Sequence, residues 1–158
     1  ALDWLTRFPN LVVTRTFSKA YGLAGLRVGY SVSRPEVADL MNRVRQPFNV
    51  NLPAQAAAIA ALADSSHLAR SVELNDGQRA RLAGSGHERG LSSLPSAANF
   101  VCLDMGRAAQ PIFQAMLKRG VIVRPVANYG LPNHLRVTVG TEAENTRFIQ
   151  ALDEALTL

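Results

Sequence analysis

Residues 16–30 read Thr-Phe-Ser-Lys-Ala-Tyr-Gly-Leu-Ala-Gly-Leu-Arg-Val-Gly-Tyr, and this stretch joins two short runs of strand-forming residues. The first run is Leu11 to Phe17, which follows the turn-forming Pro9-Asn10, and the second is Val28 to Val32. Glycines space the segment between them, and glycine lets a backbone approach a ligand closely. The pattern predicts two strands that flank a loop over Ser18 to Arg27.

Lys19 lies in this loop, and its neighbours suit an anionic ligand. Only Lys19 and Lys118 are lysines among the 17 basic residues. Hydroxyls at Thr16 and Ser18 and the guanidinium of Arg27 could hold an anion, while an amine can condense with an aldehyde. The spacing fits a glycine-rich turn with an exposed lysine equally well. A nucleotide loop fits less well, because the segment has no Gly-x-x-x-x-Gly-Lys-Ser/Thr run.

Residues 16–30 also resemble the cofactor-lysine segment of fold-type I aminotransferases, especially the histidinol-phosphate aminotransferase branch. The resemblance implies that Lys19 binds pyridoxal 5'-phosphate covalently and that Thr16, Ser18 and Arg27 bind the phosphate of this cofactor. It also implies that the Lys19 amine, once released, moves a proton during catalysis.

A second segment, Gly120 to Thr141, is similar to the carboxyl-terminal domain of the same family. Arg136 falls where aminotransferases of this fold bind the anionic group of the substrate. Arg124 falls where the histidinol-phosphate branch adds a second arginine to a substrate phosphate. Paired guanidiniums suit a dianion, and a surface ion pair on a strand is the alternative for each arginine.

Helices are expected to dominate the chain after the second strand. Residues 35–45 should form a helix, and four apolar residues at i, i+3, i+4 and i+7 predict one buried face: Val37, Leu40, Met41 and Val44. Residues 54–64 and 67–82 also favour helix. The run Gly84-Ser85-Gly86 weakens a helix and is interpreted as a hinge or boundary.

The segment from about Leu91 onward is expected to be a compact α/β unit. Strands are predicted over 98–103, 121–126 and 134–139, with a helix over 111–119 ended by Gly120. Thr141 and Glu144 form a capping-box pattern at the start of a last helix, which has an apolar face made of Phe148, Ile149, Leu152 and Leu156. Asn99, in the first of these strands, is interpreted as structural.

The predicted fold class is therefore α/β: the distal part of a fold-type I large domain, with a parallel-type sheet and helices, followed by a small α/β carboxyl-terminal domain. Residues 1–83 are assigned to the large domain with the interdomain helix, and 84–158 to the small domain. The resemblance begins in the middle of the family's fold, so the groups that hold the cofactor ring are expected to be missing. The chain alone is accordingly expected to have no useful transaminase turnover.

Composition limits the other classes of function. Hydrophobic residues make up 47% of the chain and charged residues 18%, as in globular proteins. Neither a membrane span nor a secretory signal is visible, so a cytoplasmic setting is the default. The net charge of +5 would suit nucleic acid, but basic residues alternate with acids throughout, and such a module is the less favoured alternative. Cys102 is interpreted as a buried hydrophobe, and the three histidines lack metal-ligand spacing.

The activity that the resemblance implies is transfer of an amino group between L-histidinol phosphate and 2-oxoglutarate, in histidine biosynthesis, by a homodimer. Its partners would be a small-molecule amino donor and a 2-oxo acid. An aromatic amino-acid aminotransferase or a threonine-phosphate decarboxylase of the same fold is the alternative that the sequence separates least well.

Overall fold

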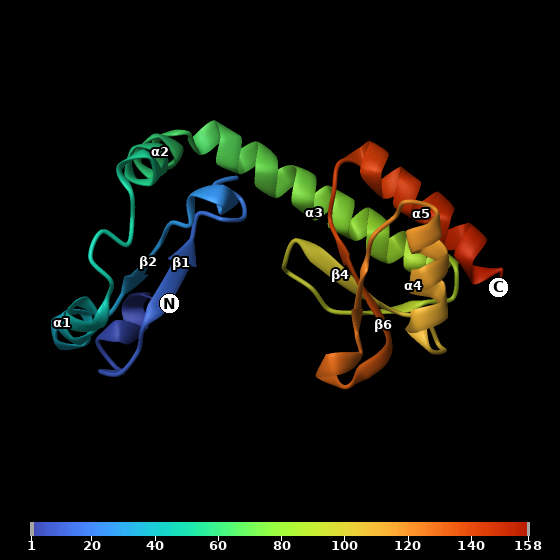
Figure 1. Cartoon of the computed structure of the whole chain (residues 1–158), viewed down its shortest axis with the longest axis horizontal. Coiled ribbons are helices and arrows are strands. Elements are labelled where there is room, and N and C mark those ends of the chain that lie inside the picture. Colours follow the sequence, from blue (N-terminus) through green and yellow to red (C-terminus); the bar gives the residue numbers. More distant parts are fainter. Residues whose placement is uncertain (1, 158) are drawn as a thin grey trace. The chain divides into compact units, whose positions relative to one another are not determined.

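The computed structural model describes residues 2–157, which fall into two compact units, one ending at Ser71 and the other beginning at Val72 (Figure 1). Short 3-10 turns accompany the helices and strands at η1 (Leu2–Leu5), η2 (Ala24–Leu26) and η3 (Ala127–Tyr129). Helix α3 (Ser65–Glu88) contributes its first residues to the first unit and the rest to the second.

Two strands, β1 (Val13–Thr16) and β2 (Gly29–Val32), form the sheet of the first unit. Both were predicted, and they pair antiparallel, with Val13 opposite Val32 and Thr16 opposite Gly29. This pair is therefore an antiparallel part of the predicted large domain. A parallel connection needs a crossover of a dozen or more residues, usually with a helix, whereas the short loop between β1 and β2 returns the chain directly.

Helix α2 (Leu52–Ala63) packs on the loop between these strands. Asn51 caps it by accepting a hydrogen bond of 2.9 Å from the Ala54 N–H, and a proline lies in its first turn, where a missing N–H costs nothing. Ala54 and Ala58 are buried against Phe17 and Val28. The small alanines therefore let the helix lie close to the loop that carries Lys19.

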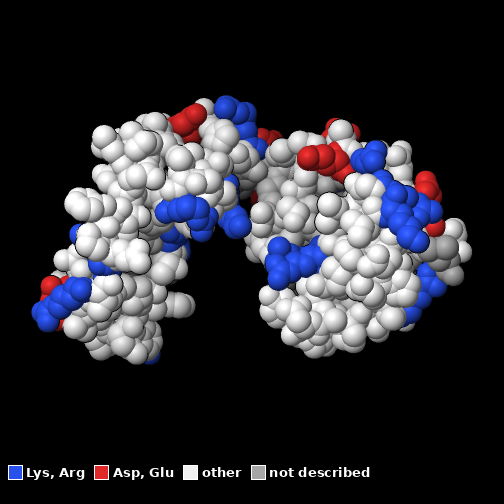
Figure 2. Space-filling model, viewed as in Figure 1, with Lys and Arg blue, Asp and Glu red and all other residues white. Residues whose placement is uncertain are grey.

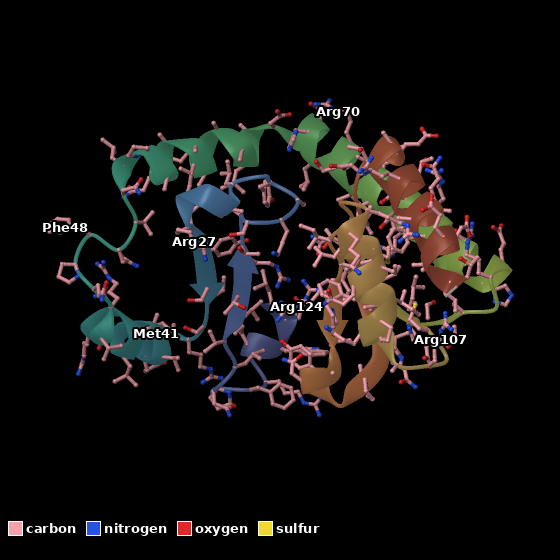
Figure 3. The ribbon with its side chains drawn as sticks, turned by 45° about the vertical axis from the view of Figure 1, so that its right-hand side comes forward. Arg27, Met41, Phe48, Arg70, Arg107 and Arg124 are labelled. Carbon is pink, nitrogen blue, oxygen red and sulfur yellow. The ribbon has the colours of Figure 1, made fainter. Side chains whose placement is uncertain are left out.

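Helix α1 (Pro35–Val44) forms as predicted, but its apolar side chains do not form a buried face. Leu40 and Val44 are 59% and 84% exposed, and Phe48, which follows the helix and is labelled in Figure 3, is 94% exposed. The prediction of burial is wrong for the described residues. Apolar spacing determines which residues share a helix face, but it carries no information on whether another element covers that face.

Helix α3 runs without interruption through Gly84-Ser85-Gly86, so the prediction of a hinge there is also wrong. A Cβ on Gly86 would lie 2.8 Å from Leu103 Cδ2, whereas one on Gly84 would meet nothing within 4 Å. Gly86 lets the helix contact the sheet closely, and this packing offsets the low helix propensity of glycine. The division into a large domain over 1–83 and a small domain over 84–158 stays a prediction.

The second unit contains a four-stranded antiparallel sheet in the order β3-β4-β6-β5. Its strands are β3 (Ser92–Leu94), β4 (Phe100–Asp104), β5 (Arg124–Val126) and β6 (Leu131–Thr138). Strand β3 was not predicted, because Ser-Ser-Leu is too short to show a period. Helix α4 (Ala109–Lys118) and helix α5 (Glu142–Leu156) cover one face together with α3 (Figure 1).

A single apolar core joins the three helices to that face. It includes Leu82 of α3, Leu103 of β4, Met116 of α4, Leu135 of β6 and Leu152 of α5. Residues in a strand alternate between the two faces, so Cys102 and Arg136 point to the other face of the sheet. The substrate arginines predicted from the sequence thus belong to the face that these helices leave uncovered.

The predicted capping box at the start of α5 is confirmed, since Thr141 and Glu144 exchange side-chain and backbone hydrogen bonds. One polar residue behind it was not predicted to be buried: Asn145 is only 2% exposed. Its amide donates to the Gly140 carbonyl at 3.0 Å and to Gln78 Oε1 at 2.8 Å, and its Oδ1 accepts from the Gly140 N–H at 3.1 Å. This network fixes the turn between β6 and α5 against α3.

Charged side chains do not gather in one patch on the face drawn in Figure 2, where Lys and Arg lie in several separate groups with Asp and Glu among them. None of the helices formed by residues 2–157 combines the length and apolarity needed to cross a membrane.

Candidate functional site

The loop between β1 and β2 is held by its own backbone. Phe17 donates its N–H to the Val28 carbonyl at 3.2 Å and accepts from the Leu23 N–H at 3.0 Å. The Phe17 ring is buried and lies 4.9 Å from the ring of Tyr21. Lys19, two residues after this anchor, accepts a turn hydrogen bond from the Gly22 N–H at 2.8 Å. A short loop with a buried aromatic anchor therefore presents Lys19, which is itself exposed.

Three predicted phosphate ligands line one open hollow of about 400 Å³ beside this loop. They are Thr16, Ser18 and Arg27. Thr16 Oγ1 accepts a hydrogen bond of 3.0 Å from the Ser18 N–H, which fixes the start of the loop at the end of β1. Lys19 is not among the lining residues, so the structure brings the three anion-binding groups together and leaves the lysine side chain at the exposed edge of the loop.

Arg27 has an unusual backbone conformation. Its φ of 54° lies in the left-handed region, which non-glycine residues rarely adopt. One guanidinium N–H donates to the Ala24 carbonyl at 2.8 Å, and Arg27, which is labelled in Figure 3, is one of the residues that line the hollow. Gly29, two residues on, lies opposite Thr16, and a Cβ there would come within 2.7 Å of the Arg15 carbonyl. Only glycine allows β2 to approach β1 at this point.

The sequence did not identify two further groups in the hollow, Arg15 and Tyr30. They lie directly opposite each other on β1 and β2. Arg15 adds a second arginine to the lining residues, and Tyr30 adds a half-exposed tyrosine. The register of the two strands brings these residues together, and a short strand pattern does not encode register.

In the second unit, Arg124 on β5 lies directly opposite Arg136 on β6. Side chains that are directly opposite on neighbouring strands lie on the same face, and two like charges placed in this way repel each other. Neither arginine forms an ion pair within the described residues. The two predicted substrate arginines are thus adjacent, and no carboxylate of residues 2–157 neutralises them.

Aromatic rings take the place of acidic partners at both guanidiniums. The Arg136 guanidinium lies 4.8 Å from the centre of the Phe100 ring, and that of Arg124 lies 6.0 Å from the ring of Tyr129. Arg136 Nε is buried and has no hydrogen-bond partner in the described part of the chain. A buried N–H donor without an acceptor is costly, so this atom marks a place where an anion would bind favourably.

Other polar groups lie on the same sheet face as Arg136. Cys102 is directly opposite it, and burial raises the pKa of the Cys102 thiol, which fits the predicted buried hydrophobe rather than a nucleophile. His134 Nε2 lies 3.9 Å from Asp104 Oδ2. Asn99, just before β4, accepts a hydrogen bond of 2.9 Å from the Val139 N–H through its backbone carbonyl, and the structural interpretation of its side chain stays a prediction. Among residues 2–157, no three or more histidine, cysteine or acidic side chains are grouped so as to hold a metal ion.

Comparison with known proteins places these features in a family. The family model "Aminotransferase class I and II" matches residues 1–152. The chain is 61% identical over 155 residues to histidinol-phosphate aminotransferase 2 of Pseudomonas fluorescens (strain Pf0-1), a match that covers 98% of this chain and 42% of the relative. It is 60% identical over 156 residues to histidinol-phosphate aminotransferase 2 of Methylococcus capsulatus, covering 99% of this chain and 42% of that protein.

Solved structures agree with this grouping. The histidinol-phosphate aminotransferase of Sinorhizobium meliloti, determined with pyridoxal-5'-phosphate, superposes with a TM-score of 0.83 at 37% identity, covering 94% of this chain and 42% of that one. The corresponding enzyme of Clostridium acetobutylicum has the same fold, with a TM-score of 0.91 at 24% identity, over 99% of this chain and 48% of that one.

The chain therefore spans about two fifths of the length of the curated relatives that it matches. The predicted α/β fold of fold-type I aminotransferases is confirmed by these structures. With the family model matched over nearly its whole length, the chain belongs to the aminotransferase class I and II family.

Proposed function

We propose that this chain is part of a pyridoxal-phosphate-dependent aminotransferase that moves an amino group between L-histidinol phosphate and 2-oxoglutarate, in histidine biosynthesis. The observation that carries the proposal is the hollow lined by Thr16, Ser18 and Arg27, next to the loop that presents Lys19. Two hydroxyls and a guanidinium match the oxygens of a phosphate monoester, so the residues present fit the phosphate of the cofactor.

Lys19 supplies the amine that would bind the cofactor covalently. The cofactor, when bound, supplies the electron sink that stabilises the negative charge developing on the substrate α-carbon. Lys19 Nζ, when free, would accept the proton from that carbon and return it. The hydrogen-bonded loop around Phe17 would limit how far this amine moves during the transfer.

Arg136 and Arg124 would bind the anionic group of the substrate. Two adjacent guanidiniums offer more parallel N–H donors than one carboxylate needs, and a phosphate dianion uses them better. The repulsion between the two arginines would be relieved when the dianion binds, which supports a phosphorylated amino donor. The names of the relatives at 60% and 61% identity agree with that choice.

The remaining parts of the proposal concern the whole protein. We infer a homodimer in the cytoplasm, acting on small molecules and not on nucleic acid, with residues 1–83 in the cofactor domain and 84–158 in the small domain. A threonine-phosphate decarboxylase of Porphyromonas gingivalis has the same fold at 27% identity, with a TM-score of 0.83, and would also need a phosphate site. Assays of the intact protein would separate three activities: transamination of histidinol phosphate, transamination of phenylalanine, as expected of an aromatic amino-acid aminotransferase, and decarboxylation of threonine phosphate.

The cofactor assignment is tested by mixing the chain with pyridoxal phosphate, reducing with borohydride and mapping the labelled peptides by mass spectrometry. Saturable labelling of Lys19, with little at Lys118, is expected. Arg27→Gln should weaken this labelling about tenfold, because a charge-assisted hydrogen bond to the phosphate is lost. Arg43→Gln is the matched control, since Arg43 pairs with Asp39 on the exposed surface of α1. Equal labelling of both lysines would contradict the assignment.

A further inference from the structure

We infer that Phe100 is a positioning residue for Arg136: its ring orients the guanidinium toward an anion while leaving every N–H donor free for that anion. The inference rests on the proposed substrate-binding role of Arg136 and adds to it the group that holds the side chain. The geometry behind it is the 4.8 Å approach of the guanidinium to the Phe100 ring, together with the absence of any ion pair to Arg136 in the described part of the chain.

The register of the sheet explains why Phe100 reaches Arg136. Cys102 is directly opposite Arg136, and Phe100, two residues earlier on β4, is opposite Thr138. Phe100 and Arg136 are therefore diagonal neighbours on one face, a distance that an aromatic ring and a long side chain can span. The contact follows from backbone pairing and needs no loop to form.

An aromatic ring and a carboxylate could each hold the guanidinium, but they differ in whether its N–H donors and its charge remain available to a ligand. A carboxylate accepts N–H groups and neutralises the charge, so a ligand would have to displace it. An aromatic face attracts the cation through its quadrupole and accepts none of the in-plane N–H groups. Arg136 Nε accordingly stays buried and has no hydrogen-bond partner among residues 2–157, and the charge of the guanidinium stays available to an incoming anion.

Tyr129 provides an internal comparison. Its ring lies 6.0 Å from the Arg124 guanidinium, at the outer limit for this interaction, and its side chain is 64% exposed. Water competes for an exposed cation, so the Tyr129 contact should orient Arg124 only weakly. Removal of the two rings should therefore have unequal effects on anion binding.

The test is titration of the chain with inorganic phosphate, followed by nuclear magnetic resonance at the arginine Nε–Hε groups. Phe100→Leu should weaken phosphate binding about fivefold and shift the Arg136 signal, which loses the ring current of the aromatic face. Phe100→Tyr should have the phosphate affinity and the Arg136 signal of the wild-type chain, because it keeps an aromatic ring. Tyr129→Leu should weaken phosphate binding by less than about twofold. The Arg119 signal, from an arginine paired with Glu154 elsewhere in this unit, should not move and reports that the variants fold.

Each other outcome overturns the inference. The first is that the wild-type chain shows no measurable phosphate binding. The second is that Phe100→Leu binds phosphate within about twofold of the wild-type affinity. The third is that Phe100→Tyr binds phosphate as weakly as Phe100→Leu. The proposed cofactor role is read separately, by labelling of Lys19. Loss of that labelling with normal phosphate results would reject the cofactor site and leave the Phe100 inference standing.

Discussion

Arg136 and Arg124 differ in how firmly each is held, although both contribute one permanent charge to the same sheet face. Arg136 lies over Phe100 and is half-buried, whereas Arg124 is exposed. Their adjacency could not be read from the sequence, because they are twelve positions apart, with a turn between them, and only the strand register places them side by side. The prediction of Thr16, Ser18, Lys19 and Arg27 needed no strand register, because these residues lie within twelve positions of one another in the sequence.

Arg136→Lys should lower the affinity for inorganic phosphate about tenfold, and Arg124→Lys by less. An ammonium group cannot bind phosphate through two parallel N–H groups, so the loss is greater where the ring holds the guanidinium. Nuclear magnetic resonance at the Nε–Hε group of the arginine that remains would measure each affinity, because it reads this site apart from the hollow lined by Thr16, Ser18 and Arg27. Arg107→Lys is the matched control, because Arg107 bonds the Leu156 carbonyl at the far end of α5. Unchanged binding by Arg136→Lys would remove Arg136 from the site.

At the scale of an element, the long helix α3 shows why helix propensity alone wrongly predicts a break at glycine residues. Gly84 and Gly86 lower helix propensity equally, and from the sequence alone they indicated a break. The structure separates them, because a side chain at 84 would meet open space and one at 86 would meet Leu103. Propensity is a local quantity, and packing against a strand elsewhere in the chain overrides it.

Gly84→Ala should raise the free energy of unfolding by about 0.5–1 kcal/mol, because alanine favours helix over glycine and is not opposed here. Gly86→Ala should lower it by about 1 kcal/mol, since the added methyl group must displace the Leu103 side chain. Urea unfolding monitored by circular dichroism would measure both changes. Two substitutions with the same sign and size would show that Gly86 does not limit the contact between α3 and β4.

Helix α1 makes the opposite point about sequence patterns. Its apolar spacing correctly predicted a helix but wrongly predicted a buried face, since Leu40 and Val44 are exposed. Periodicity reports the geometry of one element, whereas burial depends on a second element. The capping box of α5 was predictable for the converse reason: all of its hydrogen bonds lie within four residues of the chain.

At the scale of the whole molecule, the two units differ in the size of their cores. The second unit buries a cluster of sixteen side chains, and the main cluster of the first contains four, counted over the residues that the structure describes. Regions with few buried apolar contacts open more often, so backbone amides in β1 and β2 should exchange with deuterium faster than those in β4 and β6. Hydrogen exchange by mass spectrometry would measure this, and equal protection would show that the two units open together.

Acid should weaken the second unit through Asp153. The Arg89 guanidinium donates two hydrogen bonds to the Asp153 carboxylate and lowers the pKa of this carboxyl group from its ordinary value. A carboxylate whose pKa is lower in the folded state contributes stability above about pH 4, and this contribution is lost as the pH falls. Asp153→Asn should therefore reduce the pH dependence of the melting temperature below about pH 4. Glu73→Gln is the control, because Glu73 forms no ion pair among residues 2–157, and an unchanged profile in Asp153→Asn would contradict the assignment.

The left-handed backbone of Arg27 has a consequence for laboratory evolution. An L-residue in that conformation costs roughly 1–2 kcal/mol relative to glycine. A selection for heat resistance alone would therefore favour glycine at position 27, and with it the loss of the guanidinium that lines the hollow beside Lys19. Selection of this protein for thermostability should be combined with a screen for cofactor binding, since stability and cofactor binding favour different residues at position 27.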